Sequence, residues 1–499
     1  MMRKHIFSVI AYMAAFFLLT TSCKQDYLET APTDEVATAD AFKNVNNAWA
    51  ALNGIHRILY SQIFGSQPLG GQSGNMMLMD LMGEDVVLST NSSSWLRSNY
   101  QWVDHRNPSH YTVEYNYLFY YVIIGNANMI IEHIDAAEGS ETEKAFVKGQ
   151  ALAYRAWSYF QMVQLFGERF VAGAANDGLA VPLVTTPNTT ALPRNTVAEV
   201  YAQINADLEQ ALTLLDGYDR GTDKSQLNKN IVLGFMARVA LTQENYTDAA
   251  QYAREARSGF PLMDEEAYLS GFNNYAVGEW MWSSRIVADQ TNYFYSFFAH
   301  MSINYSSSLI RGTPRLIFSE LYDQISDTDV RKKLWDPTGE NVEEFPLPLS
   351  TFRRFKYHSR KFRVANEALS IGDVPYMRAA EMYLIEAEAL ARSDRSVEAA
   401  DVLFEYASTR DPEYVKSTNT GTALIDEIMI QRRSELWGEG FRFYDLKRTN
   451  TGLDRRGGNH NATIAIKMLE PAGTINWQWL IPQNEINNSG GVVVQNPQN

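Results

Sequence analysis

The chain of 499 residues carries 43 Lys and Arg against 58 Asp and Glu, which gives a formal net charge of −15 at pH 7. A hydrophobic content of 45% and a charged content of 20% exclude a disordered or fibrous chain, and the length is sufficient for a large core. Because the balance is acidic and neither a basic run nor a phosphate-cradling motif is present, we exclude roles in binding nucleic acids and nucleotides.

The first 22 residues have the order of a secretory signal. Arg3 and Lys4 precede an apolar run from Ile6 to Leu19, which is too short to span a bilayer, so we expect no transmembrane helix. Cys23 is the only cysteine, so no internal disulfide forms. Its position after the signal resembles a bacterial lipobox, although Thr20 replaces the usual leucine. We expect acylation at Cys23, which would hold the protein at a membrane surface, with a coincidental buried cysteine as the alternative.

The body of the chain reads as a succession of helices. Apolar residues recur at helical spacing from about Val113 to Ile134, and again in GQALAYRAWSYFQMVQLFGE, which Gly167 terminates. Thr196 and Glu199 form a capping box before a long apolar stripe. These patterns predict three substantial helices before residue 216.

Two later segments are predicted to form helical hairpins. Apolar stripes run from Val232 to Ala240 and from Tyr246 to Ala253, and a second pair runs from Met377 to Ala391 and from Val397 to Ala407. Both hairpins resemble tetratricopeptide units, in which small residues let paired helices approach closely. Since no constant spacing of about 34 residues runs through the chain, we expect a divergent set. The predicted fold class is all-α, with tetratricopeptide-like helical pairs, long irregular loop insertions and minor β structure.

Long helix-poor insertions separate these blocks and are rich in Gly, Asn, Ser and aromatic residues. They comprise residues 65–108, 167–195 and 261–374, with 452–499 closing the chain. Two runs within them, Glu279 to Ile286 and Trp477 to Ile481, alternate like short strands, and Trp280 and Trp282 are predicted to lie in the core. Loops of this length in a compact protein are commonly functional, so we expect the site there.

Two of these loops have the composition of a carbohydrate site. A sugar ring packs its apolar C–H face on Trp or Tyr, while its hydroxyl groups bond to Asn, Gln, Asp or Arg. Residues 93–102 and 289–295 contain that mixture. The predicted ligand-binding residues are Trp95, Asn99, Trp102, Asn292, Tyr293 and Tyr295. For each ring, packing in the interior is the competing interpretation.

Catalytic and metal-binding motifs are not evident in the sequence. It contains no HExxH, CxxC, GxSxG, P-loop or GxGxxG pattern. Eight histidines are scattered, and although His105 and His110 share one loop, no metal-ligand spacing occurs. We therefore predict no metal, no cofactor and no enzymatic activity. A glycoside hydrolase built from two distant carboxylates stays open as an alternative.

Residues 423–448, ALIDEIMIQRRSELWGEGFRFYDLKR, form the most distinctive stretch. The pattern predicts a helix with an apolar stripe and with Arg432 and Glu435 at its edges, ended by Gly438 and Gly440. The charges beyond alternate in sign beside aromatic rings, which favours local ion pairs packed against those rings. We interpret the stretch as a structural salt-bridge cluster rather than a catalytic one.

This stretch resembles the C-terminal signature of the SusD/RagB family of outer-membrane nutrient-binding lipoproteins. Other segments resemble that family in its own order, namely CKQDYLETAPTDEVATADAF, GQALAYRAWSYFQMVQLFGE, GFMARVALTQENYTDAAQYAREA, VPYMRAAEMYLIEAEALAR and WLIPQNEINNSGGVVVQNPQN. The resemblance implies a lipoprotein signal peptide at 1–22, an N-terminal SusD-like region at 23–230 and a C-terminal SusD/RagB region at 231–499. The two regions are expected to form one compact unit.

The resemblance also implies a function. In this family the ligand site is built by loops from about the two regions named above. The protein would be a non-catalytic, surface-exposed lipoprotein of a Gram-negative outer membrane that captures an oligosaccharide. It would pass the glycan to a SusC-like TonB-dependent transporter, over which it closes as a lid. A peptide- or protein-binding tetratricopeptide-like scaffold is the main alternative, and the sequence does not identify the glycan.

Overall fold

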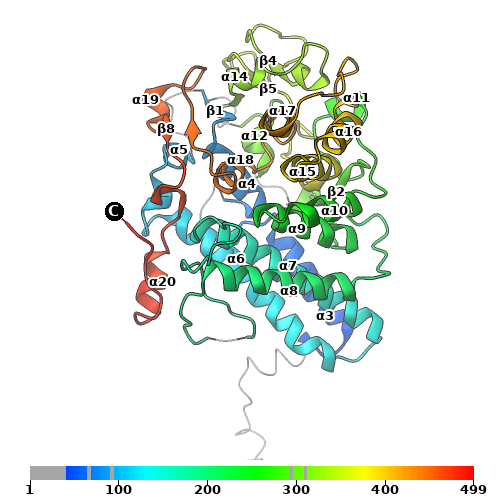
Figure 1. The fold of residues 1–499 in the computed structure, drawn as a ribbon, viewed down its shortest axis with the longest axis vertical. Coiled ribbons are helices and arrows are strands. Elements are labelled where there is room, and N and C mark those ends of the chain that lie inside the picture. The colour runs from blue at the N-terminus through cyan, green and yellow to red at the C-terminus, as the bar shows by residue number, and fades with distance from the viewer. Residues whose placement is uncertain are drawn as a thin grey trace, which may run out of the picture.

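The computed structural model describes residues 41–64, 69–89, 95–187, 189–290, 296–307 and 312–498. Helices dominate these residues and strands are few and short, which confirms the predicted fold class (Figure 1). Cys23, Asn292, Tyr293 and Tyr295 lie outside the described residues.

The long helices form one continuous array (Figure 1). In chain order they are α3 (Val45–Ile58), α6 (Tyr111–His133), α7 (Glu141–Phe166), α8 (Val197–Leu214), α9 (Lys229–Thr242), α10 (Tyr246–Ala256), α15 (Ala379–Arg392), α16 (Ser396–Ala407) and α17 (Gly421–Glu435). Each of α6 to α10 packs on the next, α10 packs on α15, and α15 packs on both α16 and α17. The array therefore continues from α10 to α15 across the long insertion between them.

The predicted helices and both predicted hairpins, α9–α10 and α15–α16, are confirmed. Thr196 and Glu199 make the reciprocal bonds of a capping box at the start of α8, and Gly167 is the C-terminal cap of α7. The α10 face against α9 and α15 is made of buried alanines, which permits close packing. Val397 and Phe404, expected on the inner stripe of α16, are instead 73% and 39% exposed because α16 lies at the outer edge of the array.

The insertion at residues 65–108 contains a helix that periodicity did not predict. This helix, α4 (Gly71–Leu81), is buried on all sides, with Gln72 as its one partly exposed residue. Its sequence GQSGNMMLMDL has no polar face, so no amphipathic pattern marks it. The helix α4 lies near the centre of the fold and contacts α5, α12 and α18.

Short strands occur in or beside several of the insertions, including residues 65–108. One antiparallel sheet has the order β1 (Val86–Leu88), β3 (Arg315–Ile317), β5 (His358–Ser359) and β4 (Trp335–Asp336), while β2 (Trp280–Ser283) pairs with β6 (Pro375–Arg378) and β7 (Leu453–Asp454) pairs with β8 (Leu469–Glu470). The strand β2 and its buried Trp280 and Trp282 confirm one prediction. The strand predicted at Trp477 to Ile481 is wrong. That segment follows a 3-10 turn and is held irregularly, with the Trp479 N–H bonded to the Leu165 carbonyl of α7.

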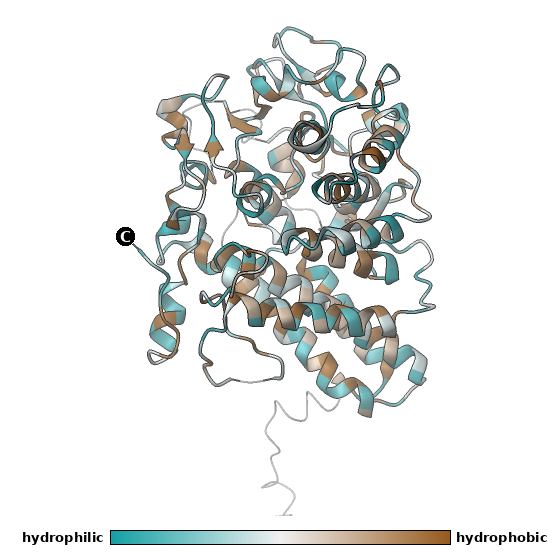
Figure 2. Cartoon of the chain, in the orientation of Figure 1, coloured by the Kyte–Doolittle hydropathy of each residue, from teal (hydrophilic) through white to brown (hydrophobic). Residues whose placement is uncertain are grey.

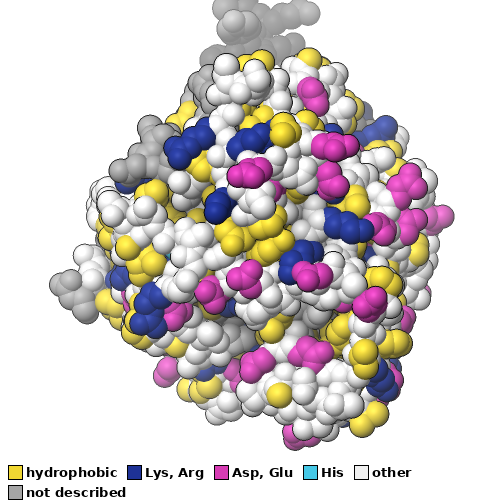
Figure 3. Space-filling view, turned by 90° about the horizontal axis from the view of Figure 1, so that it is seen from above, with side chains coloured by type: hydrophobic (Ala, Val, Ile, Leu, Met, Phe, Trp, Pro, Cys, Tyr) yellow, Lys and Arg dark blue, Asp and Glu magenta, His cyan; other side chains and the backbone are white. Residues whose placement is uncertain are grey.

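The remaining described helices are short. They are α5 (Arg97–Tyr100), α11 (Glu265–Leu269), α12 (Phe297–Met301), α14 (Ser319–Tyr322), α18 (Arg442–Arg448), α19 (Ala462–Ala465) and α20 (Gln483–Asn488). The longer helices combine polar and apolar residues along their length (Figure 2), and within the described part of the chain none has the length and apolarity needed to cross a bilayer. The upper end of the molecule in Figure 1 carries acidic and basic side chains interspersed with apolar ones (Figure 3).

Candidate ligand-binding site

Trp95, in the first loop predicted to bind sugar, lies close to a residue of the helix that follows the second such loop. The Trp95 ring lies 6.1 Å from the His300 ring, measured between centroids, at an interplanar angle of 44°. Trp95 immediately precedes α5, and His300 belongs to α12, which begins two residues after Tyr295. Both short helices pack on α4. The buried helix α4 therefore brings together two segments that lie far apart in the sequence.

The predicted residues of the first loop have different environments. Trp95 is half-buried. Asn99 is fully buried, and its amide has no hydrogen-bond partner among the described residues. Trp102 is only 5% exposed; its indole N–H donates to the Met82 carbonyl at 2.8 Å, and its ring packs edge-on against Trp477 with centroids 4.7 Å apart. Of these three side chains, Trp95 alone is in a position to reach a ligand without rearrangement.

Arg455 ties the ends of α4 and α5 together. Its guanidinium is fully buried and donates to the carbonyls of Leu81 at 2.7 Å, Gly83 at 3.0 Å and Tyr100 at 2.6 Å. The guanidinium carbon also lies 4.2 Å from the centroid of the Tyr100 ring. Burial lowers the pKa of Arg455 to about 10, so the group stays charged at pH 7. One side chain thus satisfies carbonyls at two helix ends, which would otherwise be buried without partners.

His460 also holds α5. Residues 95–102, which comprise α5 and its two flanking turns, are called the platform. The Nδ1 of His460 is hydrogen-bonded to the Tyr100 hydroxyl, and its Nε2 lies 2.8 Å from the Glu84 carbonyl oxygen. Burial lowers the pKa of His460 to about 3, so the ring is neutral at pH 7. Sequence reasoning identified neither Arg455 nor His460, because no local pattern announces a side chain that bonds to distant main-chain atoms.

The backbone on either side of α5 is in the left-handed region. Leu96 has φ of 69° and Trp102 has φ of 61°, values that bulky L-residues rarely adopt. Such conformations cost of order 1–3 kcal/mol each and persist only where the surroundings impose them. Here Arg455, His460 and Trp477 supply those surroundings. The α5 platform is therefore held rigidly before any ligand binds.

The stretch at residues 423–448 holds the end of α4, on which the platform packs. The Asp80 carboxylate at the end of α4 accepts hydrogen bonds from the Gly440 N–H at 2.9 Å and the Arg442 N–H at 3.3 Å. Arg442 also pairs with Glu84, and Arg433 pairs with Asp85 at 2.6 Å. The predicted structural ion-pair cluster is confirmed, but most of its partners lie on distant segments rather than locally.

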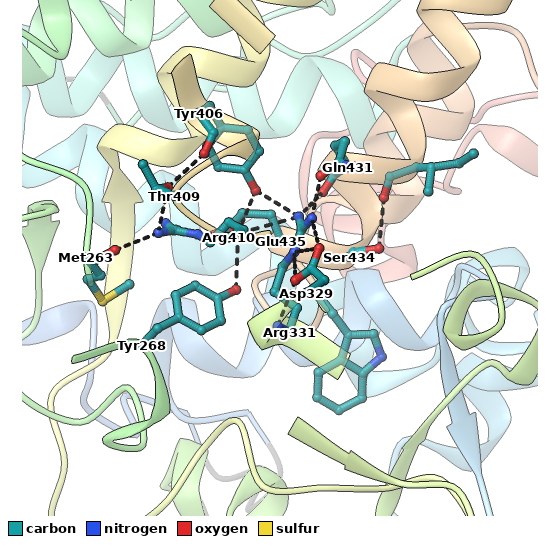
Figure 4. A network of polar contacts seen from close by, with 12 residues as sticks. Met263, Tyr268, Asp329, Arg331, Tyr406, Thr409, Arg410, Gln431, Ser434 and Glu435 are labelled. Atoms are coloured by element: carbon teal, nitrogen blue, oxygen red, sulfur yellow. Dashed lines mark hydrogen bonds and ion pairs between the residues drawn. The ribbon is translucent and has the colours of Figure 1, made fainter. Parts of the chain in front are cut away.

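Glu435 lies at the centre of a second, fully buried network (Figure 4). Its carboxylate accepts from Arg378 at 2.7 Å, from Arg410 at 3.1 Å and from the Tyr406 hydroxyl at 2.6 Å. Burial acts to raise its pKa, but the charges of Arg410, Arg378 and Arg331 hold that pKa well below its usual range. Glu435 was expected at the edge of its helix and is instead 0% exposed. A network so completely paired and buried supports the fold rather than a reaction.

Metal binding and enclosed ligand binding find little support in the described residues. No group of three or more His, Cys, Asp and Glu side chains there is arranged to hold a metal ion. A pocket of about 60 Å³ between α4, α7, α9 and α15 is far smaller than the roughly 300 Å³ at which ligand pockets begin. A second pocket of about 280 Å³ lies beside the ends of α7 and α18.

The fold and the platform define an α-helical repeat protein that carries its candidate site on the insertions between helical pairs. Residues 28–241 match a family model described as starch-binding associating with outer membrane, and residues 240–498 match the SusD family model. The chain belongs to the SusD family.

Relatives support the same assignment over nearly the whole chain. SusD-like protein P2 of Formosa agariphila is 25% identical over 484 residues, covering 89% of this chain and 91% of that protein. A SusD-like carbohydrate binding protein from Bacteroides vulgatus superimposes with a TM-score of 0.78 at 26% identity, covering 90% of this chain and 97% of its own. A laminarin binding SusD-like protein has the same fold, with a TM-score of 0.69 at 20% identity over 91% of this chain and 100% of its own.

Proposed function

We propose that the protein binds an oligosaccharide at the platform carrying Trp95 and passes it to a SusC-like TonB-dependent transporter, without cleaving it. The observation that carries this proposal is the approach of the Trp95 ring to His300, a residue of the helix that follows the second loop. The names of two structural relatives, one carbohydrate-binding and one laminarin-binding, support a glycan as the ligand.

In this proposal the Trp95 indole stacks on the apolar face of a sugar ring. Asn292, Tyr293 and Tyr295 would contribute ring and amide contacts from the second loop, while the buried Asn99 and Trp102 support the platform from inside. Because Arg455 and His460 already hold α5, little conformational entropy is lost on that side when the glycan binds.

The replacement Trp95→Ala tests the ligand site. Truncating a stacking ring should weaken glycan binding by about 1–3 kcal/mol, measured by calorimetry against a panel of polysaccharide fragments that includes laminarin oligosaccharides. The matched control is Phe404→Ala, which removes a 39% exposed ring from α16, away from the site. An unchanged titration for Trp95→Ala would remove this residue from the site, and binding of peptides instead of glycans would favour the scaffold alternative.

Membrane attachment belongs to the same proposal. Acyl chains on Cys23 would hold the protein at the outer membrane, since each buried CH₂ group contributes about 0.8 kcal/mol. The replacement Cys23→Ser should therefore move the protein from the membrane fraction to the soluble fraction, as followed by fractionation and immunoblotting. Persistence of the variant in the membrane fraction would contradict acylation. The transporter would contact the extended face of the helical array, since repeat arrays offer broad surfaces.

A further inference from the structure

A second concave site lies where the C-terminal end of α7 meets the end of α18 and residues 473–478. Its volume is about 280 Å³, close to the lower limit for small-molecule pockets. Trp477 lies in its wall, packed face-to-face against Phe443 with ring centroids 5.6 Å apart and edge-on against Trp102. This packing fixes the position of the indole, so one wall of the pocket is rigid.

Lys447 places a buried cation in the wall of this pocket. Its side chain is largely buried, and its ammonium donates to the carbonyls of Gln164 at 2.6 Å and Gly167 at 2.8 Å. None of the ion pairs within the described part of the chain includes Lys447, and Glu168 is the acid whose charge acts on it. Two of the three ammonium N–H groups are thus satisfied by main-chain oxygens, and the positive charge is not neutralised by a bonded carboxylate.

The rest of the wall is polar and carries a second cation. Arg169 is half-buried and uses Nη1 to bond Glu244 at 2.7 Å. The side chains of Asn450, Thr451 and Thr474 also line the pocket. The Thr474 hydroxyl donates to Glu470 at 2.5 Å and can still accept a hydrogen bond, and the Thr451 hydroxyl is bonded to that of Thr449 at 2.9 Å. Because Arg169 is already paired with Glu244, Lys447 is the lining cation that no bonded carboxylate of the described residues neutralises, and Glu168 is the one acid among the lining residues. This ammonium favours an anion beside it.

We propose that this pocket binds a small hydroxylated carboxylate, a uronic acid or another sugar acid, with the carboxylate near Lys447 and Arg169 and the hydroxyl groups bonded to Asn450, Thr451 and Thr474. A carboxylate would supply the bonded counter-charge that Lys447 lacks, and charge-assisted hydrogen bonds are stronger than neutral ones. This site is separate from the Trp95 platform and does not depend on the function proposed there.

The electrostatics of Lys447 agree with this assignment. Burial lowers the pKa of its ammonium to about 7, against the opposing charge of Glu168. Part of the desolvation cost of the cation is therefore uncompensated without ligand, and a bound carboxylate would offset it. Titrations are best run at pH 6, where the ammonium is mostly charged.

Calorimetry on the purified full-length protein tests the proposal, with glucuronate, glucose, inorganic phosphate and an oligouronide as separate titrants. We expect glucuronate to bind at least tenfold more tightly than glucose. Phosphate binding as tightly as glucuronate would show a site for any small anion. Glucose binding as tightly as glucuronate would show that the carboxylate does not contribute to the affinity. Either result overturns the proposal. Binding of the oligouronide as well as the monosaccharide would identify a polymer end as the source, and binding of the monosaccharide alone would identify a free sugar acid.

Two variants locate the binding. Lys447→Met removes the charge at similar volume and should weaken glucuronate binding at least tenfold. Because that buried change can also disturb folding, Thr451→Phe provides a second test, since it places a ring at the exposed rim of the pocket. Its matched control is Thr463→Phe on α19, an exposed threonine outside the pocket.

We expect Thr451→Phe to weaken glucuronate binding at least tenfold and Thr463→Phe to leave it unchanged. Full glucuronate affinity in Thr451→Phe would overturn the proposal. Trp95→Ala should lose neutral glycan binding while retaining glucuronate binding, so failure at one site is distinguishable from failure at the other.

Discussion

The replacement Gly440→Ala tests whether the 423–448 stretch sets the position of α4 and, through it, of the ligand platform. Gly440 has φ of +87°, and its N–H donates to Asp80 at 2.9 Å. A Cβ atom built there would lie 2.6 Å from the Met76 Cα and 2.9 Å from the Met76 Cβ. The nearest atom belongs to the main chain of a buried helix, so no side-chain rotation relieves the overlap.

The expected loss of stability has two parts. A left-handed conformation costs an L-residue about 1–2 kcal/mol, and forcing an extra methyl group into a packed interior costs about 1–3 kcal/mol more. Gly421→Ala is a matched control, because Gly421 has φ of +54° and a Cβ there would meet no heavy atom within 4 Å. Gly421→Ala should therefore lower the free energy of unfolding by the conformational cost alone. The difference between the two variants, about 1–3 kcal/mol, isolates the close approach to α4.

Equilibrium denaturation with urea measures both variants, and calorimetry with the bound glycan measures the consequence for the site. Since α5 and α12 pack on α4, displacement of α4 should also weaken glycan binding in Gly440→Ala but not in Gly421→Ala. If Gly440→Ala proves no more destabilising than Gly421→Ala, the close approach of Gly440 to Met76 does not set the position of α4, and this reasoning is refuted.

Two further predictions concern buried charge. Glu435→Gln should lower the free energy of unfolding by about 3–5 kcal/mol, because it leaves buried arginines without their counter-charge. The control Glu398→Gln breaks an exposed pair with Arg395 and should cost under about 1 kcal/mol. Equal losses by urea denaturation would contradict the structural function of the network. Burial lowers the pKa of His105 and of His460 to about 3, so below pH 6.5 the unfolded state binds protons that the folded state does not. Stability should therefore fall as the pH drops from 6.5 towards 3, by up to about 1.4 kcal/mol per pH unit for each histidine. Burial raises the pKa of Asp80 to about 7, which opposes this trend between about pH 4 and 7; His105→Gln should flatten the pH profile of unfolding, and an unchanged slope would contradict the assignment.

The helical framework was predictable because local signals decide it. The capping box at Thr196, the terminating Gly167 and the alanine-rich hairpins all act within a few residues. The helix α4 was not predictable in this way, because a helix buried on every side has no polar face to give it a period. Trp477 to Ile481 alternates like a strand, yet its bonds go to α7 and to the chain near the C-terminus, which no local pattern records.

The candidate site was predictable only in outline. Composition singled out the loop containing Trp95, which remains a prediction, and the structure places Trp95 near His300 of the helix that follows the second loop. Composition did not separate Trp95 from Trp102, which belongs to the same mixture but is packed between Trp477 and the Met82 carbonyl. Nor could it show that Arg433 pairs with Asp85, since the two residues lie 348 positions apart.

The bonds that hold the platform explain how ligand loops can vary on a fixed base. Arg455 donates to main-chain carbonyls, the Trp437 indole N–H donates to the Asp85 carbonyl at 2.8 Å, and the Gly440 N–H is a main-chain donor to Asp80. Main-chain carbonyls are present whatever side chain a residue carries. The carbonyls that Arg455 and Trp437 contact include those of Leu81, Gly83, Tyr100 and Asp85, so a change of side chain at residues 90–94 should leave these contacts and the position of α5 intact.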